Sequence, residues 1–100
     1  MPKNIILSKS AKADIHEIIQ FIQRDKPVAA EKFRILLEMK IQPLENFSER
    51  GKKIELLKDT ERKNHRELVF PPCRIFYRVL DKEVHILRVL HSRQNFDLSS

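Results

Sequence analysis

Apolar residues recur along the chain with two different periods, and the change of period separates a helical half from a strand-rich half. The isoleucines within residues 15–22 stand at positions i, i+3, i+4 and i+7, which predicts an amphipathic helix that ends near Arg24. Ser8 or Ser10 supplies the N-cap hydroxyl of this helix. Asp14 and the other polar residues fall off the apolar stripe, so they are expected to face solvent.

A second helix is predicted to begin at Pro27, because the fixed backbone angle and missing N–H of proline suit the first helical turn. One side of this helix carries apolar residues, and Pro43 should end or kink the helix near Ile41. The link between the two helices is short, which predicts a helical hairpin. Ahead of the hairpin, residues 3–7 (KNIIL) are interpreted as a short strand.

Beyond residue 64 the apolar residues alternate, as is typical of β-strands. Residues 65–70, 73–80 and 83–90 are rich in β-branched and aromatic side chains, and short breaks between them predict antiparallel neighbours. Residues 46–63 lack a clear period and are interpreted as a long connection, with a short strand or turn around residues 54–57. The element order β-α-α-β-β-β predicts a single α+β domain over residues 1–100, with a helical hairpin packed on one face of a small, mainly antiparallel sheet.

The hairpin covers one face of such a sheet, so the other face is predicted to be open. Strict alternation places Cys73 and Tyr77 in the core and His85 on the same side as Val89. The residues predicted on the open face are Arg74, Phe76, Arg78, Ile86, Arg88 and Leu90. An apolar face that also carries arginines suggests a partner that covers it.

Composition excludes several classes of function. The chain has 100 residues and a single glycine, Gly51, so it lacks the glycine-rich loops of dinucleotide-binding and P-loop proteins. A single cysteine, Cys73, excludes an internal disulfide and multi-cysteine zinc modules. No apolar run approaches the length of a membrane span, so no membrane association is expected and the cytoplasm is the expected location.

The charge balance points to an anionic partner. The formal net charge is +6 and the isoelectric point is about 9.7. Most of the excess lies in residues 50–66, whose basic residues are Arg50, Lys52, Lys53, Lys58, Arg62, Lys63 and Arg66. This segment is either a solvated loop and strand edge or a contact surface for an acidic target.

Candidate chemistry rests on arginines and histidines. No histidine has a carboxylate or cysteine at ligand spacing, so neither a metal site nor a cofactor is expected. His91, at the end of a strand, is either a surface imidazole or an acid/base group. Arg74, Arg78 and Arg88 project from strands. Such arginines bind phosphates, stabilise developing charge or clamp carboxylates, unless they simply pair with a neighbouring glutamate.

Three segments carry a resemblance to a known family. The runs SKSAKADIHEIIQFI, DKPVAAEKF and above all CRIFYRVLDKEVHILRVLHSRQNF resemble the RelE/ParE superfamily of toxins from bacterial toxin–antitoxin systems. The resemblance implies a cytoplasmic toxin that is neutralised when an acidic segment of its cognate antitoxin wraps around it. Outside this family, the alternative is a non-toxic, basic nucleic-acid-binding module.

The resemblance implies one of two activities. One branch of the superfamily comprises metal-independent endoribonucleases that cleave mRNA on the ribosome; the other, ParE-like branch poisons DNA gyrase and is not a nuclease. Arg74 stands where the nuclease branch often has a functional arginine, but the ending His91-Ser92-Arg93 lacks the His-Tyr pair of that branch and favours the ParE-like branch. Arg74 and His91 are the predicted catalytic residues if the chain is a nuclease. The residues predicted to bind the target or the antitoxin are Arg74, Arg78, Arg88, His91 and Arg93.

Overall fold

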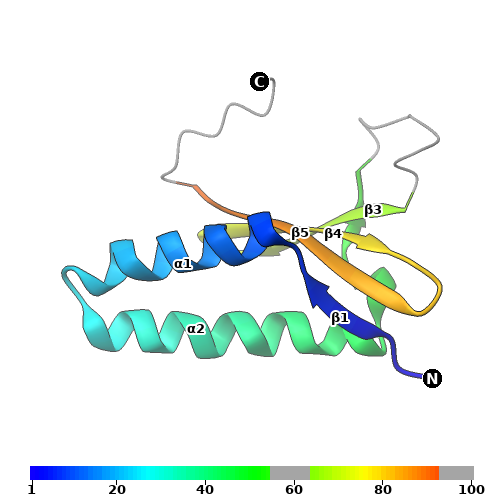
Figure 1. Cartoon of the computed structure of the whole chain (residues 1–100), viewed down its shortest axis with the longest axis horizontal. Coiled ribbons are helices and arrows are strands. Elements are labelled where there is room, and N and C mark those ends of the chain that lie inside the picture. Colours follow the sequence, from blue (N-terminus) through cyan, green and yellow to red (C-terminus); the bar gives the residue numbers. More distant parts are fainter. Residues whose placement is uncertain (55–63, 93–100) are drawn as a thin grey trace.

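A computed structural model describes residues 1–54 and 64–92 and shows two helices beside a twisted sheet (Figure 1). The helical elements are α1 (Lys9–Gln23), α2 (Pro27–Ile41) and the 3-10 turns η1 (Gln42–Glu45) and η2 (Ser48–Arg50). The strands are β1 (Asn4–Leu7), β2 (Lys52–Lys53), β3 (His65–Phe70), β4 (Cys73–Val79) and β5 (Glu83–His91). The predicted α+β fold is confirmed, with β2 as an additional two-residue strand. Most of the strand or turn expected around residues 54–57 lies outside the described residues.

The sheet has five strands in the order β1-β5-β4-β3-β2. β1 pairs with β5 in parallel, and the other neighbours are antiparallel. The α1–α2 hairpin packs on one side of the sheet and buries a core in which Leu44, Ile75 and Tyr77 have no exposed surface. Neither described helix combines the length and the apolar character that a membrane span requires.

Local sequence signals account for the starts of both helices. The Ser8 hydroxyl accepts the Ala11 N–H at 3.0 Å and donates to the Leu87 carbonyl at 2.9 Å, so one side chain caps α1 and anchors it to β5. Pro27 occupies the first turn of α2, as predicted. The predicted ends of the two helices, near Arg24 and Ile41, are also confirmed.

The alternation predicted for the last strand is wrong because β5 contains a bulge. Phe76 pairs with Arg88 but Tyr77 pairs with Ile86, which leaves Leu87 as an extra residue. The extra residue reverses the faces on its N-terminal side. Ile86 is therefore fully buried in the core instead of lying on the open face, and His85 lies on the same face as Arg78.

The prediction that Asp14 faces solvent is also wrong, because α1 lies along the edge of β5 where β1 has ended. The Asp14 carboxylate accepts the Val89 N–H at 2.9 Å, which would otherwise be an unpaired edge group. The same carboxylate accepts two hydrogen bonds from Arg88, at 2.7 and 2.9 Å. Asp14 is consequently buried and closes this edge of the sheet.

Candidate functional site

We define the open face as the side of the sheet that no described helix covers. Directly paired residues on neighbouring strands project from the same face, so the pairing places side chains in cross-strand rows. Three of the rows on the open face are Val69–Arg74–Leu90, Lys52–Glu67–Phe76–Arg88 and His65–Arg78–His85–Ile6. The open face therefore combines cations with apolar side chains. Leu90, predicted on this face, pairs with Arg74 but is only 7% exposed.

Arg74 is held in place on the open face. Its Nε donates to the Glu67 carboxylate, and its guanidinium lies 5.7 Å from the centre of the Phe76 ring. The Arg74 side chain is 54% exposed, so the ion pair with Glu67 adds little stability but orders the guanidinium. The remaining N–H groups of Arg74 are available to an anionic partner.

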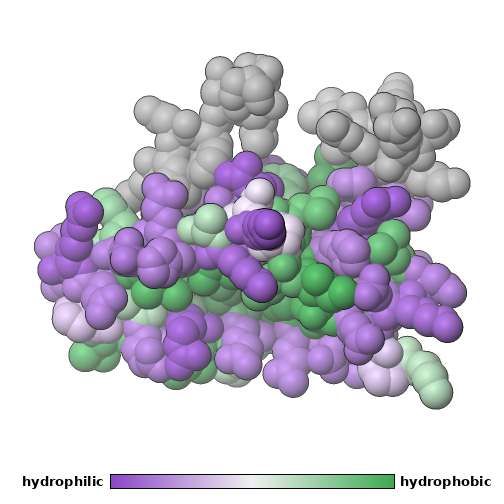
Figure 2. Space-filling view, viewed as in Figure 1, coloured by the Kyte–Doolittle hydropathy of each residue, from purple (hydrophilic) through white to green (hydrophobic). Residues whose placement is uncertain are grey.

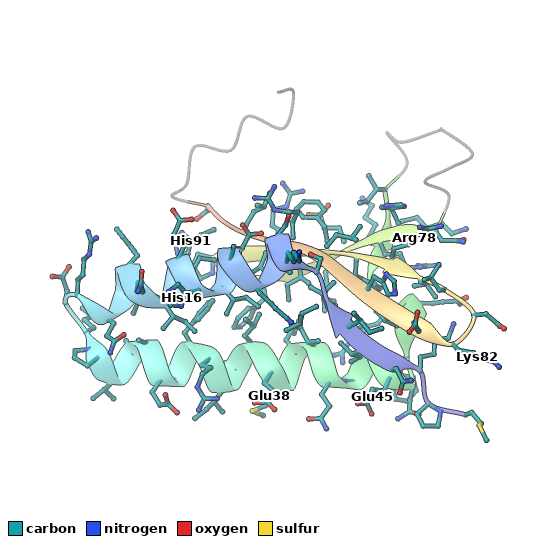
Figure 3. The ribbon with its side chains drawn as sticks, in the orientation of Figure 1. His16, Glu38, Glu45, Arg78, Lys82 and His91 are labelled. Carbon is teal, nitrogen blue, oxygen red and sulfur yellow. The ribbon has the colours of Figure 1, made fainter. Side chains whose placement is uncertain are left out.

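Arg78 stands between two imidazoles on the open face, because it pairs with His65 of β3 and with His85 of β5. Within the described residues, the Arg78 guanidinium forms no ion pair, whereas His85 Nε2 lies 3.0 Å from Glu83 Oε1. Figure 3 shows Arg78 on the part of the sheet remote from α2. Arg74 and Arg78 are thus exposed residues of this face, whereas Arg88 is only partly exposed.

Arg88 is engaged in the fold. Its guanidinium forms two parallel hydrogen bonds with the buried Asp14 carboxylate, and these bonds raise the pKa of Arg88 above its ordinary value. The Arg88 side chain is still 44% exposed at the margin of the open face. Its hydrogen bonds with Asp14 connect β5 to α1 and so stabilise the fold.

His91 lies apart from Arg74. It pairs with the buried Cys73, so it projects from the core face, whereas Arg74 pairs with Leu90 and projects from the open face. His91 borders a pocket at the end of the helical hairpin, lined also by Phe21, Ile22, Asp25, Lys26 and Pro72. Arg93, the last predicted site residue, lies outside the described residues.

The turn before β2 is a feature that sequence reasoning missed. The Tyr77 hydroxyl donates to the Ser48 carbonyl and accepts the Gly51 N–H, each at 2.8 Å. A Cβ atom at Gly51 would lie 2.5 Å from that hydroxyl oxygen, so the only glycine in the sequence marks a close approach. Arg66 strengthens the turn by donating to the carbonyls of Glu49 and Gly51.

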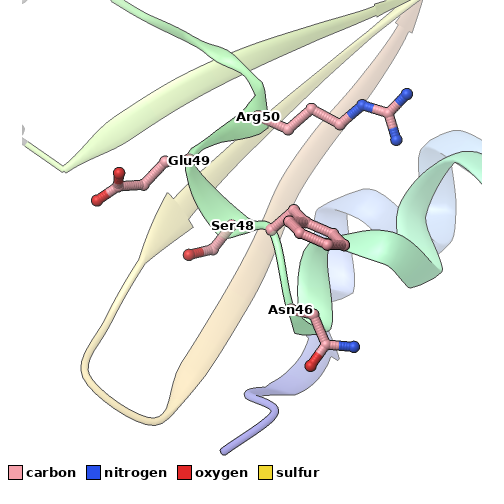
Figure 4. A pocket seen from close by; sticks show the side chains of 5 residues that line it. Asn46, Ser48, Glu49 and Arg50 are labelled. Carbon is pink, nitrogen blue, oxygen red and sulfur yellow. The ribbon is translucent and has the colours of Figure 1, made fainter.

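This turn presents part of the basic segment that the sequence singled out. Residues 46–50 line a pocket in which the side chains of Glu49 and Arg50 extend in different directions (Figure 4). Phe47 is 67% exposed beside them. Lys58, Arg62 and Lys63, which belong to the same basic segment, lie outside the described residues.

A second apolar surface lies on the helical side and had no clear sequence signal. Its apolar lining comes from three elements, since Ile5 and Leu7 of β1 meet Ile15 of α1 and Leu37 and Ile41 of α2. Polar residues border this groove, namely Arg34, Glu38, Gln42 and Glu45. Figure 2 shows hydrophobic atoms between hydrophilic ones on this side of the molecule. The chain therefore exposes apolar side chains on both sides of the sheet.

Cys73 is predicted to lower the stability of the fold in alkaline solution. Burial raises the pKa of this thiol to about 11, whereas an exposed thiol has a pKa of about 8.5. Between these values the folded thiol keeps its proton and the unfolded thiol loses it, so unfolding becomes more favourable as pH rises. Urea titrations at about pH 7.5 and about pH 9.5 should show a larger loss of stability for the native chain than for Cys73→Ala. Equal losses would contradict the predicted role of Cys73.

Comparisons with known proteins agree with this architecture. The chain resembles a P. aeruginosa protein from the structure of a chromosomal ParDE toxin–antitoxin system, with 23% identity and a TM-score of 0.72 over 89% of this chain and 95% of that one. It also resembles a chain of the RelBE2 toxin–antitoxin complex of Mycobacterium tuberculosis, with 22% identity and a TM-score of 0.61 over 91% and 92% of the two chains. At these identities the likeness concerns the fold alone.

The family comparison concerns the sequence itself. No curated protein sequence matches this chain. The model of the family described as "ParE toxin of type II toxin-antitoxin system, parDE" matches residues 5–96, which is nearly the whole sequence. The chain therefore belongs to the ParE toxin family of type II toxin–antitoxin systems.

Proposed function

We propose that this ParE-family toxin inhibits growth by acting on DNA gyrase in the bacterial cytoplasm and does not cleave RNA. The observation that carries the proposal is the separation of Arg74 and His91. These two residues are the ones on which cleavage would depend, yet they project from opposite faces of the sheet. Membership of the ParE family supports the same target.

The physical reason lies in the geometry of phosphodiester cleavage. A general acid or base must come within hydrogen-bond reach of the proton that it transfers, and a stabilising cation must reach the same phosphate. Arg74 on the open face and His91 on the core face do not meet this requirement together. Ser92 follows His91, and a serine hydroxyl is a poor replacement for a second acid/base side chain.

An experiment in cells tests this proposal. Brief expression of the chain should stop growth and should change the supercoiling of a reporter plasmid, while translated messages stay intact. Supercoiling is read from the topoisomer distribution and message integrity from primer extension. Growth arrest with normal supercoiling and codon-specific message cuts would contradict the proposal.

A ribosome-dependent mRNA endonuclease is the second candidate, and one observation favours it. His65 and His85 flank Arg78 on the open face, and two imidazoles beside a guanidinium are groups that can transfer protons near a phosphate. If this arrangement cleaves RNA, Arg78→Gln should abolish message cleavage on translating ribosomes. Message that stays intact with the native chain would exclude this candidate.

We also propose that a cognate antitoxin covers the open face with an acidic, amphipathic segment. The face combines the exposed guanidiniums of Arg74 and Arg78 with apolar side chains, of which Val69 is 56% and Ile6 is 40% exposed. The net charge of +6 favours an acidic partner, and a segment that folds on binding can cover a large surface.

Arg74 is predicted to act in binding and not in stability. Arg74→Ala removes one charge-assisted contact with a partner, which should weaken binding by about tenfold to hundredfold. Toxicity in a growth assay should fall, while the melting temperature should stay close to that of the native chain. Arg34→Ala is the matched control, because Arg34 is an exposed arginine paired with Glu31 on α2. Full toxicity of Arg74→Ala would show that Arg74 does not contact the target.

A further inference from the structure

The row His65–Arg78–His85 concentrates nitrogen donors at one place on the open face. The three residues belong to three adjacent strands, and Arg78 pairs directly with both histidines. Side chains at directly paired positions have Cβ atoms about 5 Å apart, so the two imidazoles flank the guanidinium within reach of one ligand. Because the row stands on paired strands, the sheet holds these side chains in a defined order.

The charge of this row depends on pH. Arg78 is always protonated, whereas histidine side chains generally change charge between about pH 5 and pH 8. The row therefore combines a guanidinium with two side chains of the residue type that can gain a positive charge in mildly acidic solution. A bound anion favours the protonated imidazoles, so binding of the anion and uptake of protons should reinforce each other.

We propose that the row His65–Arg78–His85 is a proton-linked anion site that receives carboxylates from the acidic segment of the antitoxin. The proposal rests on the antitoxin partner proposed above and is independent of the gyrase target. Lowering the pH from about 8 to about 6 should tighten the complex, because two additional cations then face the carboxylates.

The neighbouring groups are compatible with this role. The charged and titratable residues that face the row from the described strands are Glu83 and Arg88 of β5, Glu67 of β3, Arg74 of β4 and Lys52 of β2. Glu67 and Arg74 pair with each other, and Arg88 pairs with Asp14. Glu83 Oε1 lies 3.0 Å from His85 Nε2. β1 contributes the neutral residues Asn4 and Ile6.

The surroundings of the row favour a protein segment over a nucleic acid. Ile6 continues the row on β1 and is 40% exposed, so an apolar side chain lies directly beside the cations. Single-stranded nucleic acids are usually held by several aromatic side chains on which bases stack. Among the described residues of the open-face rows, Phe76 is the only aromatic ring besides the imidazoles, and its ring already lies under Arg74.

The test measures the binding of a labelled peptide of about ten residues, in which glutamate alternates with alanine, to the full chain. Fluorescence anisotropy gives the dissociation constant at about pH 8 and about pH 6 at constant ionic strength, where the glutamates remain ionised. Native protein should bind about tenfold more tightly at the lower pH, since each exposed ion pair contributes about two- to fivefold. The double variant His65→Gln, His85→Gln should retain a change of about twofold or less.

Two further variants separate the row from the overall charge of the protein. His16→Gln is the matched control, because His16 is an exposed histidine on α1, and it should keep the full pH response. Arg78→Gln should weaken binding at both pH values. A full pH response in the double histidine variant, or an equal loss in His16→Gln, would overturn the proposal.

A competing ligand decides the class of partner. A single-stranded oligonucleotide of equal charge should bind without the same dependence on His65 and His85, and an identical dependence would overturn the assignment to a protein segment. The anion-site proposal and the antitoxin proposal can fail independently of each other. If the adjacent reading frame does not neutralise the toxin in cells, the antitoxin proposal fails even where the peptide measurements identify an anion site.

Discussion

Replacing Asp14 with alanine is expected to lower the free energy of unfolding by about 2–4 kcal/mol. The substitution removes two hydrogen-bond acceptors of the Arg88 guanidinium and the carboxylate oxygen that accepts the Val89 N–H at the edge of β5. A half-exposed arginine regains part of its hydration, but a buried backbone N–H does not, so the loss exceeds that of a surface ion pair. Urea denaturation measures the effect.

Glu17→Ala is the matched control for Asp14→Ala, because Glu17 is an exposed carboxylate on the same helix. Its effect should stay within about 0.5 kcal/mol. A double-mutant cycle with Arg88→Ala isolates the pairwise energy between the two side chains. If Asp14→Ala is as stable as Glu17→Ala, the edge of β5 does not depend on this carboxylate.

Tyr77→Ala should lower the free energy of unfolding by about 3–5 kcal/mol, which is the usual range for truncating a buried aromatic side chain. The Tyr77 ring lies fully buried in the core, and its hydroxyl fixes the turn before β2. Tyr77→Phe separates the two contributions. It keeps the ring but leaves the Gly51 N–H and the Ser48 carbonyl without that partner, at a cost of about 1–3 kcal/mol.

Phe47→Ala is the control for the aromatic truncation. Phe47 belongs to the same turn region but is 67% exposed, so its removal should change stability by about 0.5 kcal/mol or less. Thermal or urea unfolding ranks the three variants. Tyr77→Phe with native stability would show that the hydroxyl does not hold the turn.

The parts of the fold that were predictable have strong local signals. The N-cap at Ser8, the proline that opens α2 and the period-two pattern of β3 and β4 each depend on residues close in sequence. The bulge at Leu87 has no such signal, since the sequence around it is as apolar and β-branched as the rest of β5. Its consequence, the burial of Ile86, becomes visible only in the pairing of β4 with β5.

In the candidate site, too, the predictable features depend on local sequence and the missed ones depend on contacts between distant parts of the chain. Arg74 and Arg78 lie on the open face because the alternation of β4 is regular. Asp14 was misplaced because its role depends on a contact 74 residues away, although its spacing from Ala11 and Ile18 places all three on one side of α1. The pairing of His65 and His85 with Arg78 also required the register of three strands.

The most direct test of the central claim, that this ParE-family toxin acts on gyrase and not on RNA, is a supercoiling reaction with purified components. Relaxed plasmid, gyrase and ATP are incubated with increasing amounts of the full chain, and a parallel reaction contains translating ribosomes. The proposal predicts that supercoiling falls or linear plasmid accumulates with the native chain, less so with Arg74→Ala, while ribosome-bound message stays intact. Unchanged supercoiling together with codon-specific cuts in the message would contradict it.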